Sequence, residues 1–331
     1  MNKENVKISI IGGAVLDVLA GAAGPEVFET GSMPMDYIRT SFGGDALNEA
    51  VVLSRLGKKT ELITRLGNDE VGNRICAFLD ENGVSHDKTI MTDEYASSTN
   101  IVLVDKKGER FFLTDPASSQ RKLFEDDIAK STDEMADIVS FASIFVSPPL
   151  KPENLGRLFR QIKKRRIILT DMTKPKNGEK LQDLRSCLPY IDYFLANNDE
   201  ISMLTGESVP RENAELLIKE GVGCAVIKLG AKGCIIKTAD AFYEIPAYSD
   251  CKVIDTTGAG DSFAAGFLYG LSEKFSLKDC GLFGCAVASC VVENIGGAEG
   301  VKSLEEPLQR FEKMKAGYNK NCDDLCLPER I

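Results

Sequence analysis

Short apolar, β-branched runs alternate along the chain with segments in which apolar residues recur every three or four positions. The runs that predict strands are VKISIIGG, KTELITRLG, ASIFVS, RRIILTDM, YIDYFLAN and CAVIKLG. Helical spacing appears in DALNEAVVLSRLG and in the segment around VGNRICAFLDENG. Buried strands joined by crossover helices imply a mainly parallel sheet with helices on both faces. The pattern therefore predicts a doubly wound α/β domain.

Two stretches interrupt this alternation. Residues 27–41 and 98–114 have an extended pattern, and a hairpin signal at Asp105 to Gly108 separates IVLV from RFFLT. Because strands joined by a short hairpin do not fit easily into a central parallel sheet, we expect a small β lid over one edge of the domain. We therefore expect one domain over residues 1–318 that carries two lid insertions, and a polar C-terminal tail over residues 319–331.

Composition restricts the class of partner. The 331 residues include 40 basic and 50 acidic side chains, a formal charge of −10, which disfavours nucleic acid or an anionic membrane as the main partner. No run approaches the ~20 apolar residues of a membrane span, and the first apolar run is typical of a strand and not of a signal peptide. The ten cysteines lack the regular spacing of a disulfide framework. We expect reduced thiols and a cytoplasmic protein.

The stretch VIDTTGAGDSF, Val253 to Phe263, combines a turn of small residues with an acid at the start of a helical pattern. Gly258, Ala259 and Gly260 allow another group to approach their backbone N–H groups closely. These amides and the positive end of the helix dipole predict an anion site. Asp261 lies at the same point, where Asp is also a common N-cap. The fragment GAGD alone fits helix capping and anion binding about equally.

The longer string DTTGAGDSFAAGF resembles the signature of the PfkB, or ribokinase-like, family of carbohydrate and nucleoside kinases, without a break from Asp255 to Phe263. SFGGDALNEAVVLSRLG is similar to the N-terminal GG-x-x-x-N signature of that family, with Gly43, Gly44 and Asn48 in place. The family resemblance implies a ribokinase-like fold and an ATP-dependent kinase that transfers the γ-phosphate to a primary hydroxyl of a small, ribose- or fructose-like sugar.

Weaker motifs occur in the order expected for this family. IGGAVLDVLAG places Asp17 just beyond the first predicted strand, where similar kinases bind sugar hydroxyls with an aspartate, but an Asx turn or helix cap also fits. ANNDE resembles the element in which Asn197 and Glu200 organise Mg²⁺ and its waters, and by itself it also fits a simple loop. KLGAKG resembles a nucleotide-binding turn, although a hairpin turn needs the same glycines.

The resemblance implies a role for each motif in phosphoryl transfer. The amides of Gly258, Ala259 and Gly260 form an anion hole, and Asp261 accepts the proton of the attacking hydroxyl. Mg²⁺ bridges the phosphates, and Glu200 acts on it largely through water. The residues implied to hold the sugar are Asp17, Gly43, Gly44, Asn48 and Arg110. The residues implied to bind ATP are Asn197, Lys228, Gly230 and Gly233.

Two further properties follow from the resemblance. Asp255 begins the signature at a place where similar kinases bind a monovalent cation, usually K⁺. Dimerisation through lids is common in similar kinases, and exposed lid edges invite pairing between chains. We therefore expect a homodimer that forms through the lid.

Several positions depart from the ribokinase pattern and put ribose itself in doubt. Asp45 stands where ribokinases have a lysine, Ser147 lies where they tend to have a glutamate, and Cys285 falls near a common adenine-contacting asparagine. KKGERFFLTDPASS resembles instead the fructokinase-like branch, so side chains of this segment could face the sugar. The candidates are Arg110, Phe112 and Asp115, and the strand alternation makes some of them lid packing.

The remaining candidates lie at loops. Asp171 and Lys174 follow a predicted strand whose carboxyl end should point to the site, because open α/β sheets bind ligands there. His86, the only histidine, lies in a polar loop, and a surface position is the favoured interpretation.

Other functions are kept as alternatives. A nucleoside kinase of the same fold needs an aromatic platform near the lid, which Phe42 or Phe112 could provide. A sugar-binding regulator without catalysis would not require Asp261. A dinucleotide-dependent oxidoreductase is disfavoured because the first glycines do not follow G-x-G-x-x-G, and a Walker A loop is absent from the sequence.

Overall fold

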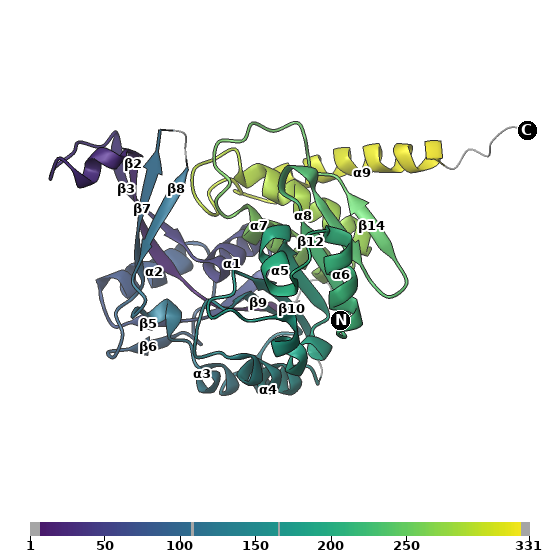
Figure 1. Cartoon of the computed structure of the whole chain (residues 1–331), viewed down its shortest axis with the longest axis horizontal. Helices are drawn as coiled ribbons and strands as arrows, with labels where there is room; N and C mark the ends of the chain where they lie inside the picture. Colours follow the sequence, from purple (N-terminus) through teal and green to yellow (C-terminus); the bar gives the residue numbers. More distant parts are fainter. Residues whose placement is uncertain (1–6, 107–108, 165, 326–331) are drawn as a thin grey trace, which may run out of the picture.

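A mostly parallel eight-stranded sheet runs through the centre of the computed structural model, which describes residues 7–106, 109–164 and 166–325 (Figure 1). The strand order is β14-β13-β12-β11-β10-β9-β1-β4; β13 is antiparallel to both of its neighbours and the other pairs are parallel. The strands are β1 (Lys7–Ile11), β4 (Lys59–Ile63), β9 (Ile138–Ile144), β10 (Ile167–Met172), β11 (Tyr193–Asn197), β12 (Cys224–Lys228), β13 (Cys234–Lys237) and β14 (Phe242–Ile245). The predicted doubly wound fold is confirmed.

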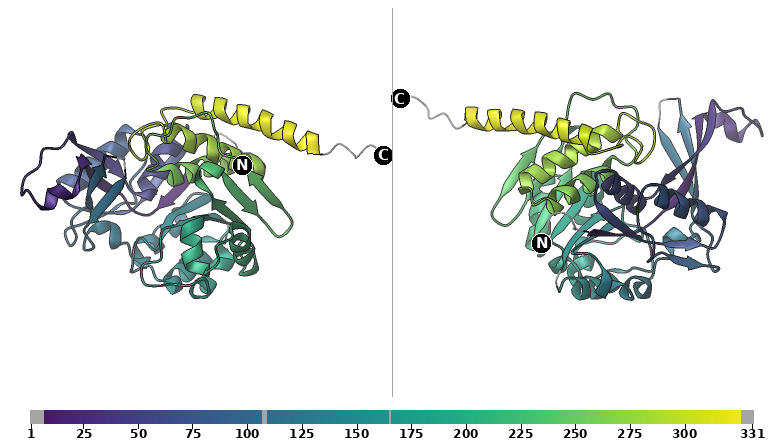
Figure 2. Two further views of the ribbon diagram at one scale, coloured as in Figure 1. Left: turned by 45° about the horizontal axis from the view of Figure 1, so that its top comes forward. Right: turned by 180° about the vertical axis from the view of Figure 1, so that it is seen from behind.

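Helices cover both faces of this sheet, and its strands are therefore buried on both sides (Figure 2). Ile8 and Ile10 of β1 belong to a core with α1, α2, α7, α8 and α9, whereas Ile11 belongs to a second core with α3, α4, α5 and α6. Neighbouring residues of a strand point to opposite faces, which divides the apolar side chains between the two cores. The helices are α1 (Asp45–Arg55), α2 (Glu70–Glu81), α3 (Glu125–Ala129), α4 (Pro152–Ile162), α5 (Asn198–Thr205), α6 (Pro210–Lys219), α7 (Ala259–Ser272), α8 (Leu277–Val291) and α9 (Glu305–Leu325).

A separate four-stranded sheet forms the predicted β lid, in the order β3-β2-β7-β8 (Figure 1). Its strands are β2 (Val15–Ala23), β3 (Tyr37–Gly43), β7 (Thr99–Asp105) and β8 (Arg110–Thr114). The expected stretch 98–114 contains β7 and β8, and Gly108 of its hairpin lies outside the described residues. In the expected stretch 27–41, β3 begins at Tyr37, and its partner β2 directly follows β1 in the chain. Because VLDVLAGAA contains many small residues, its alternation of apolar and polar positions is too weak to predict this strand.

The described structure also contains a third, two-stranded sheet and a long final helix. β5 (Arg65–Gly67) and β6 (Ile90–Thr92) pair in parallel beside the lid. α9 packs against α8 and extends away from the body of the molecule (Figure 2). It continues to Leu325, through part of the expected tail 319–331, and residues 326–331 lie outside the described range. Among the helices of the described residues, none combines the length and the apolar character that a membrane crossing requires.

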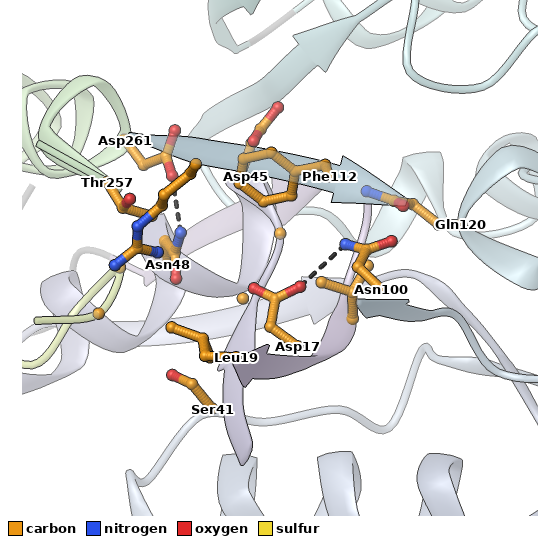
Figure 3. A pocket seen from close by; sticks show the side chains of 17 residues that line it. Asp17, Leu19, Ser41, Asp45, Asn48, Asn100, Phe112, Gln120, Thr257 and Asp261 are labelled. Atoms are coloured by element: carbon orange, nitrogen blue, oxygen red, sulfur yellow. Dashed lines mark hydrogen bonds between the residues drawn. The ribbon is translucent and has the colours of Figure 1, made fainter. Parts of the chain in front are cut away.

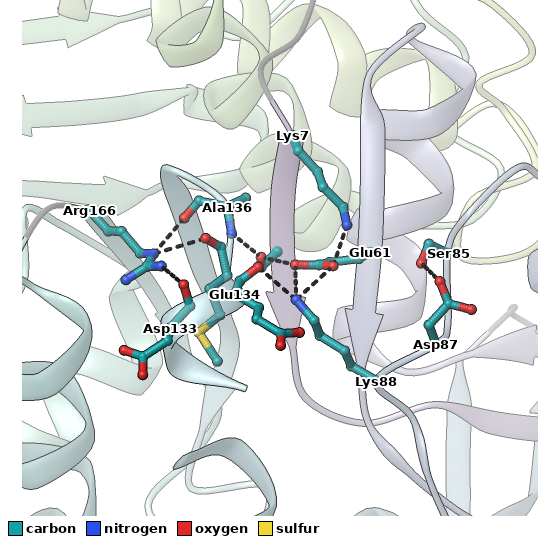
Figure 4. A network of polar contacts seen from close by, with 11 residues as sticks. Lys7, Glu61, Ser85, Asp87, Lys88, Asp133, Glu134, Ala136 and Arg166 are labelled. Atoms are coloured by element: carbon teal, nitrogen blue, oxygen red, sulfur yellow. Dashed lines mark hydrogen bonds and ion pairs between the residues drawn. The ribbon is translucent and has the colours of Figure 1, made fainter. Parts of the chain in front are cut away.

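A buried polar network joins the amino-terminal ends of several central strands (Figure 4). Glu61 of β4 forms ion pairs with Lys7 (2.5 Å) and Lys88 (3.2 Å) and accepts a hydrogen bond from Ser9. Burial raises the pKa of Glu61, but these three hydrogen bonds outweigh it and hold the pKa below its usual range. Ser9 in turn accepts a hydrogen bond from the backbone of Ala136, just before β9 (2.8 Å). The network fixes strand ends far from the motifs of the predicted site.

Candidate active site

Two glycine-containing loops and helix α1 pack closely at the carboxyl ends of the central strands. Gly258 is the N-cap of α7 and has a φ of 70°, a left-handed value that favours glycine. A Cβ at Gly258 would lie 2.0 Å from the carbonyl oxygen of Gly297, and a Cβ at Gly297 would lie 2.6 Å from the side-chain amide of Asn48. Because glycine has no side chain at these two positions, the turn before α7 can pack closely against the loop at Gly297, and that loop against α1.

The start of α7 presents backbone N–H groups to this region. The first N–H groups of a helix have no acceptor within the helix. The amide of Ala259 donates to the carbonyl of Thr256 at 3.2 Å, within the turn itself. The helix therefore offers the amides of Gly260 and Asp261, together with the positive end of its dipole, to an anion. The anion hole predicted at Gly258, Ala259 and Gly260 stays a prediction, and within that turn the amide of Ala259 is already bonded.

Asp261 lies in the first turn of α7, and its carboxylate faces a cavity. Gly258 occupies the N-cap position, and no side chain caps this helix, so capping does not account for Asp261. Asn48 Nδ2 of α1 donates to Asp261 Oδ2 at 2.7 Å (Figure 3). Burial, with the nearby charge of Asp45, raises the pKa of Asp261 well above its usual range. The carboxyl group is therefore buried beside the cavity and held in place by one amide, and its predicted role as proton acceptor stays a prediction.

The cavity beside Asp261 has a volume of about 240 Å³ and lies between the lid and the domain. Its floor includes Gly43, Gly44 and Asn48, and its lid side includes Asp17 and Arg110. All five predicted sugar-binding residues therefore line one cavity together with Asp261. Gly44 has a φ of 98°, and a Cβ there would lie 2.6 Å from the carbonyl oxygen of Gly13.

Asp17 is held on the lid opposite Asp261 (Figure 3). Asn100 Nδ2 of β7 donates to Asp17 Oδ1 at 2.9 Å, because β2 and β7 pair with these two residues in register. Burial raises the pKa of Asp17, although the hydrogen bond from Asn100 opposes the shift. A Cβ at Gly43 would lie 2.6 Å from Asp17 Oδ2, so the glycine leaves room for this carboxylate. Asp17 is therefore part of a strand pair and not of an Asx turn or helix cap.

A second, larger cavity of about 590 Å³ lies on the other side of the same turn. It is lined mainly by apolar and small residues, among them Tyr248, Phe263 and Cys285. The predicted ATP-binding residues that line it are Asn197, Lys228, Gly230 and Gly233. Gly233 also forms the hairpin between β12 and β13, where a Cβ would lie 2.0 Å from the carbonyl oxygen of Ile245. The hairpin and nucleotide-site interpretations of KLGAKG are thus compatible.

Lys228, at the end of β12, connects the second cavity with the buried acids. Its ammonium group forms an ion pair with Asp171 at the end of β10, and the two side chains are 13% and 5% exposed. Burial lowers the pKa of Lys228, but the carboxylate of Asp171 outweighs it, so the pKa is raised and the lysine keeps its charge. A Cβ at Gly260 would lie 3.3 Å from Lys228 Nζ. A cation therefore stands beside the first amides of α7.

Glu200 and Asn197 lie at the carboxyl end of β11. Asn197 Oδ1 accepts a hydrogen bond from the backbone N–H of Glu200 at 2.8 Å and so caps α5. Burial raises the pKa of Glu200 to about 7. In the described part of the chain, no three acidic, cysteine or histidine side chains cluster as a metal cage. Mg²⁺ needs no such cage, because one or two carboxylates, water and phosphate oxygens complete its shell. The residues present fit this cation.

Asp255 and Arg110 form an ion pair between the lid and the loop before α7. Asp255 Oδ2 also accepts the N–H of Gly296 at 2.9 Å, and Oδ1 accepts the N–H of Thr257 at 3.0 Å. At the predicted monovalent-cation position, the structure therefore places a guanidinium and two backbone donors.

Of the other candidates, Phe112 alone among those that follow lines one of the two cavities. Phe42 stacks on Phe78 at 4.3 Å between ring centroids, whereas Phe112 lines the smaller cavity. Asp115 Oδ1 accepts the N–H of Ala117 in a loop turn, and Ser147 exchanges two hydrogen bonds with the backbone of Leu123. His86 pairs with Asp80 near the surface, as the sequence predicts for a surface position.

The sequence interpretation missed several residues of the site. Asn100 and Gln120 line the smaller cavity, and Glu49, which is fully buried, directly follows the cavity residue Asn48 in α1. Ser140 donates to Glu49 Oε2 at 2.7 Å, Glu49 Oε1 has no hydrogen-bond partner in the described structure, and burial raises the pKa of Glu49. A carboxylate one residue after Asn48, inside an otherwise apolar helix face, is the signal that could have identified Glu49.

Comparisons with known proteins identify the family of this chain. The family model described as pfkB family carbohydrate kinase matches residues 6–304. A protein of Archaeoglobus fulgidus named as an uncharacterized sugar kinase is 35% identical over 249 residues, which are 75% of this chain and 97% of that protein. A nucleoside kinase of Methanocaldococcus jannaschii is 26% identical over 316 residues, 95% of this chain and 99% of its own length.

The fold has solved counterparts. The structure of Arabidopsis thaliana ribokinase complexed with ribose and ATP superposes with a TM-score of 0.79 at 22% identity and covers 93% of this chain and 99% of its own. At this identity the likeness concerns the fold alone.

Proposed function

The chain belongs to the pfkB family of carbohydrate kinases, and we propose that it transfers the γ-phosphate of ATP to a primary hydroxyl of a small, uncharged sugar. One observation carries the proposal: the two cavities meet at the turn from Gly258 to Asp261. A phosphate bound to the amides of this turn and a sugar hydroxyl beside Asp261 are then in reach of each other. Phosphoryl transfer requires mainly such positioning and neutralisation of charge.

Each residue at and near the turn has its own role in the proposed reaction. Asp261 accepts the proton of the attacking hydroxyl, and Asn48 orients the carboxylate. The N–H groups of Gly260 and Asp261, with the ammonium of Lys228, stabilise the negative charge on the transferred phosphoryl group. The lid brings Asp17 and Asn100 over the sugar and keeps water from the phosphoryl group.

We assign the divalent cation to the carboxyl end of β11. Mg²⁺ would be held by Glu200 and Asn197 through water and would neutralise charge on the β- and γ-phosphates of ATP. The carboxyl group of Glu200, with its pKa of about 7, loses its proton readily when a cation is near. The predicted K⁺ at Asp255 is left out of the proposed function, because Arg110 already balances that carboxylate.

The charges that line the smaller cavity favour an uncharged substrate. Three carboxylates, Asp17, Asp45 and Asp261, face it. Arg110 is the only cation among the described residues that line it, and Asp255 neutralises this guanidinium. A sugar phosphate or sugar acid would meet repulsion without a free cation, whereas hydroxyl groups can donate hydrogen bonds to carboxylates and amides. This supports a neutral pentose or ketohexose as the substrate.

A coupled assay of ATP consumption tests the function. The compounds to compare are ribose, fructose, 2-keto-3-deoxygluconate, tagatose phosphates, adenosine, inosine and pseudouridine. We expect turnover with a neutral sugar, abolished in the Asp261→Asn variant as the matched control. Turnover confined to a charged sugar would contradict the proposed substrate class, and a protein that binds sugar without consuming ATP would be the catalytically silent regulator instead.

A nucleoside kinase is the second candidate, and Phe112 is the observation that favours it. Its ring lines the sugar cavity and is 50% exposed, so a base could stack on it. The Phe112→Ala variant separates the two: it should weaken nucleoside binding strongly and sugar binding little.

The outer face of the lid supports a homodimer. Apolar side chains on this face are 47–70% exposed: Ile38, Ile101, Phe111 and Leu113. They alternate with the cavity-facing residues along β3, β7 and β8. A second copy of the chain, with the same apolar face, is the partner that this patch fits, because two-fold contacts are self-complementary. Light scattering should give twice the chain mass, and a Phe111→Lys variant should give a monomer.

We place the protein in the cytoplasm. The proposal is supported by the use of ATP and by the thiols of the described residues, which are free: Cys76, Cys187, Cys224, Cys234, Cys251, Cys280, Cys285 and Cys290.

A further inference from the structure

Arg110 and Asp255 join the lid to the loop that leads into α7. Arg110 is the first residue of β8, an edge strand of the lid, and its guanidinium forms an ion pair with Asp255 Oδ2. The side chains are 11% and 7% exposed, so the two charges face each other out of contact with bulk water. Arg110 also lines the sugar cavity, which places the pair beside the reacting groups.

The other partners of Asp255 are N–H donors as well. Gly296 donates to Oδ2 at 2.9 Å and Thr257 donates to Oδ1 at 3.0 Å. Three donors therefore converge on one carboxylate, an environment that suits an anion. A hard cation takes oxygen ligands, and at this carboxylate it would meet a guanidinium of like charge. The contacts of Asp255 do not fit a bound alkali cation.

We propose that Arg110 is the built-in cation of this site, so that the kinase works without K⁺. The inference rests on the proposed function, in which the loop after Asp255 holds the phosphoryl group. Asp255 fixes that loop through Thr257 and, through Gly296, the neighbouring loop that packs under Gly258. An uncompensated carboxylate would loosen this arrangement and repel phosphate, and the guanidinium removes its charge.

The ion pair of Arg110 and Asp255 also makes the order of the turn before α7 depend on the position of the lid. Because Arg110 is carried by the lid, the guanidinium reaches Asp255 only when β8 lies over the sugar cavity. Arg110 is thus a positioning residue, which acts on the phosphoryl group through Asp255 and the turn that follows it.

The wild-type protein provides the first test. Turnover is compared in KCl, NaCl and tetramethylammonium chloride at one ionic strength, and thermal unfolding is followed in the same salts. We expect kcat to agree within about twofold, without a K⁺-specific rise in the unfolding midpoint. Activation by K⁺ of about tenfold or more, or a K⁺-specific rise in the midpoint, would overturn the inference. The unfolding measurement needs no substrate, so a failure of the proposed function is seen separately, as absent turnover in every salt.

The Arg110→Met variant provides the second test, because methionine keeps much of the length and removes the charge. We expect kcat to fall by up to ~10² through misplacement of the loop. Guanidinium chloride below denaturing concentration, or K⁺, should raise the kcat of this variant several-fold while leaving the wild-type protein unchanged. Rescue by a free cation is a result that a purely structural role of Arg110 does not give.

Arg39→Met is the matched control. Arg39 is another lid arginine, exposed and stacked 5.0 Å from the ring centroid of Tyr37, so this variant should keep its kcat and show no rescue. An Arg110→Met variant with wild-type kcat, or with a low kcat that neither guanidinium nor K⁺ raises, would contradict the inference. If Arg110→Met does not fold, the salt comparison on the wild-type protein decides the question by itself.

Discussion

Buried carboxylates occupy two regions of this molecule, and their surroundings differ. At the amino-terminal side of the sheet, Lys7 and Lys88 pair with Glu61 and outweigh burial, so the pKa of Glu61 lies below its usual range (Figure 4). At the carboxyl ends of the strands, Asn48 is the hydrogen-bond partner of Asp261, and burial raises the pKa of that carboxyl group (Figure 3). The first region uses its charges to hold strands together, and the second holds the acid that we propose for proton transfer.

The difference shows how stability and activity are separated in the fold. Glu49, Glu200 and Asp17 share the raised pKa of Asp261, and burial is the leading cause in each. Because ionisation of each buried group destabilises the folded state relative to the unfolded chain, we expect these acids to lower the free energy of unfolding at neutral pH. The Glu61 network at the other end adds stability under the same conditions. Substitutions in the two regions should therefore have opposite effects on activity and on stability.

The Asp261→Asn variant should show the largest effect. Loss of the general base should lower kcat by ~10² to 10⁴. ATP affinity measured by calorimetry should stay near the wild-type value, and the free energy of unfolding at neutral pH should stay the same or rise, because a buried charge is removed. A purified variant with near-normal kcat would remove Asp261 from the mechanism.

Glu61→Gln should give the converse result. Removal of the charge leaves Lys88 without its buried partner, whereas the Lys7 side chain is 43% exposed and screened by water, so the free energy of unfolding should fall by about 2 kcal/mol. The kcat should not change, since the network lies away from both cavities. Glu215→Gln, in an exposed pair with Arg211, is the matched control and should cost less than about 1 kcal/mol. Loss of kcat in folded Glu61→Gln protein would break the proposed division between the two regions.

Asp17→Ala should weaken the binding of the sugar in the smaller cavity and leave the binding of ATP in the larger cavity unchanged. The sugar loses a charge-assisted hydrogen bond, so sugar affinity should fall by about 10- to 100-fold while ATP affinity stays constant. Asp115→Ala, on the lid but in a loop turn, is the control and should change neither affinity. Calorimetry of the two ligands measures both, and an unchanged sugar affinity in Asp17→Ala would place Asp17 outside the site.

The effect of pH on stability should be the smallest. The folded protein keeps a proton on Glu200 up to a pKa of about 7, whereas the unfolded chain loses it near 4.5, so the free energy of unfolding falls as pH rises through this window. Partial exposure of Glu200 limits the change to about 1 kcal/mol. Glu200→Gln should remove that part of the slope. Glu61 acts in the opposite direction, because its stabilisation is lost when pH falls below about 4.5. An identical slope in wild type and Glu200→Gln would show that other groups cause it.

The fold and the turn before α7 could be predicted from sequence because their signals are local. Strand and helix periods decide the layers, and the proposed anion hole consists of consecutive amides of one turn. The contacts Asn48 to Asp261, Asn100 to Asp17 and Arg110 to Asp255 join positions 213, 83 and 145 residues apart. Such contacts depend on strand register and loop packing, which no local pattern encodes.

The lid was the least predictable region for the same reason. β2 follows β1 after only three residues yet belongs to another sheet, and its small side chains give weak alternation. Without that strand, the register that places Asn100 beside Asp17 could not be known. Glu49 was missed because a buried acid in an apolar helix face becomes meaningful only when its neighbours in space are known.

A crystal structure with ADP, aluminium fluoride and the sugar that the activity screen identifies tests the central claim most directly. The account predicts fluorine atoms within about 3 Å of the backbone nitrogens of Gly260 and Asp261, and one sugar hydroxyl at a similar distance from the Asp261 carboxylate. A fluoride complex bound away from the start of α7, or a sugar hydroxyl that contacts another base while Asp261 points elsewhere, would contradict it.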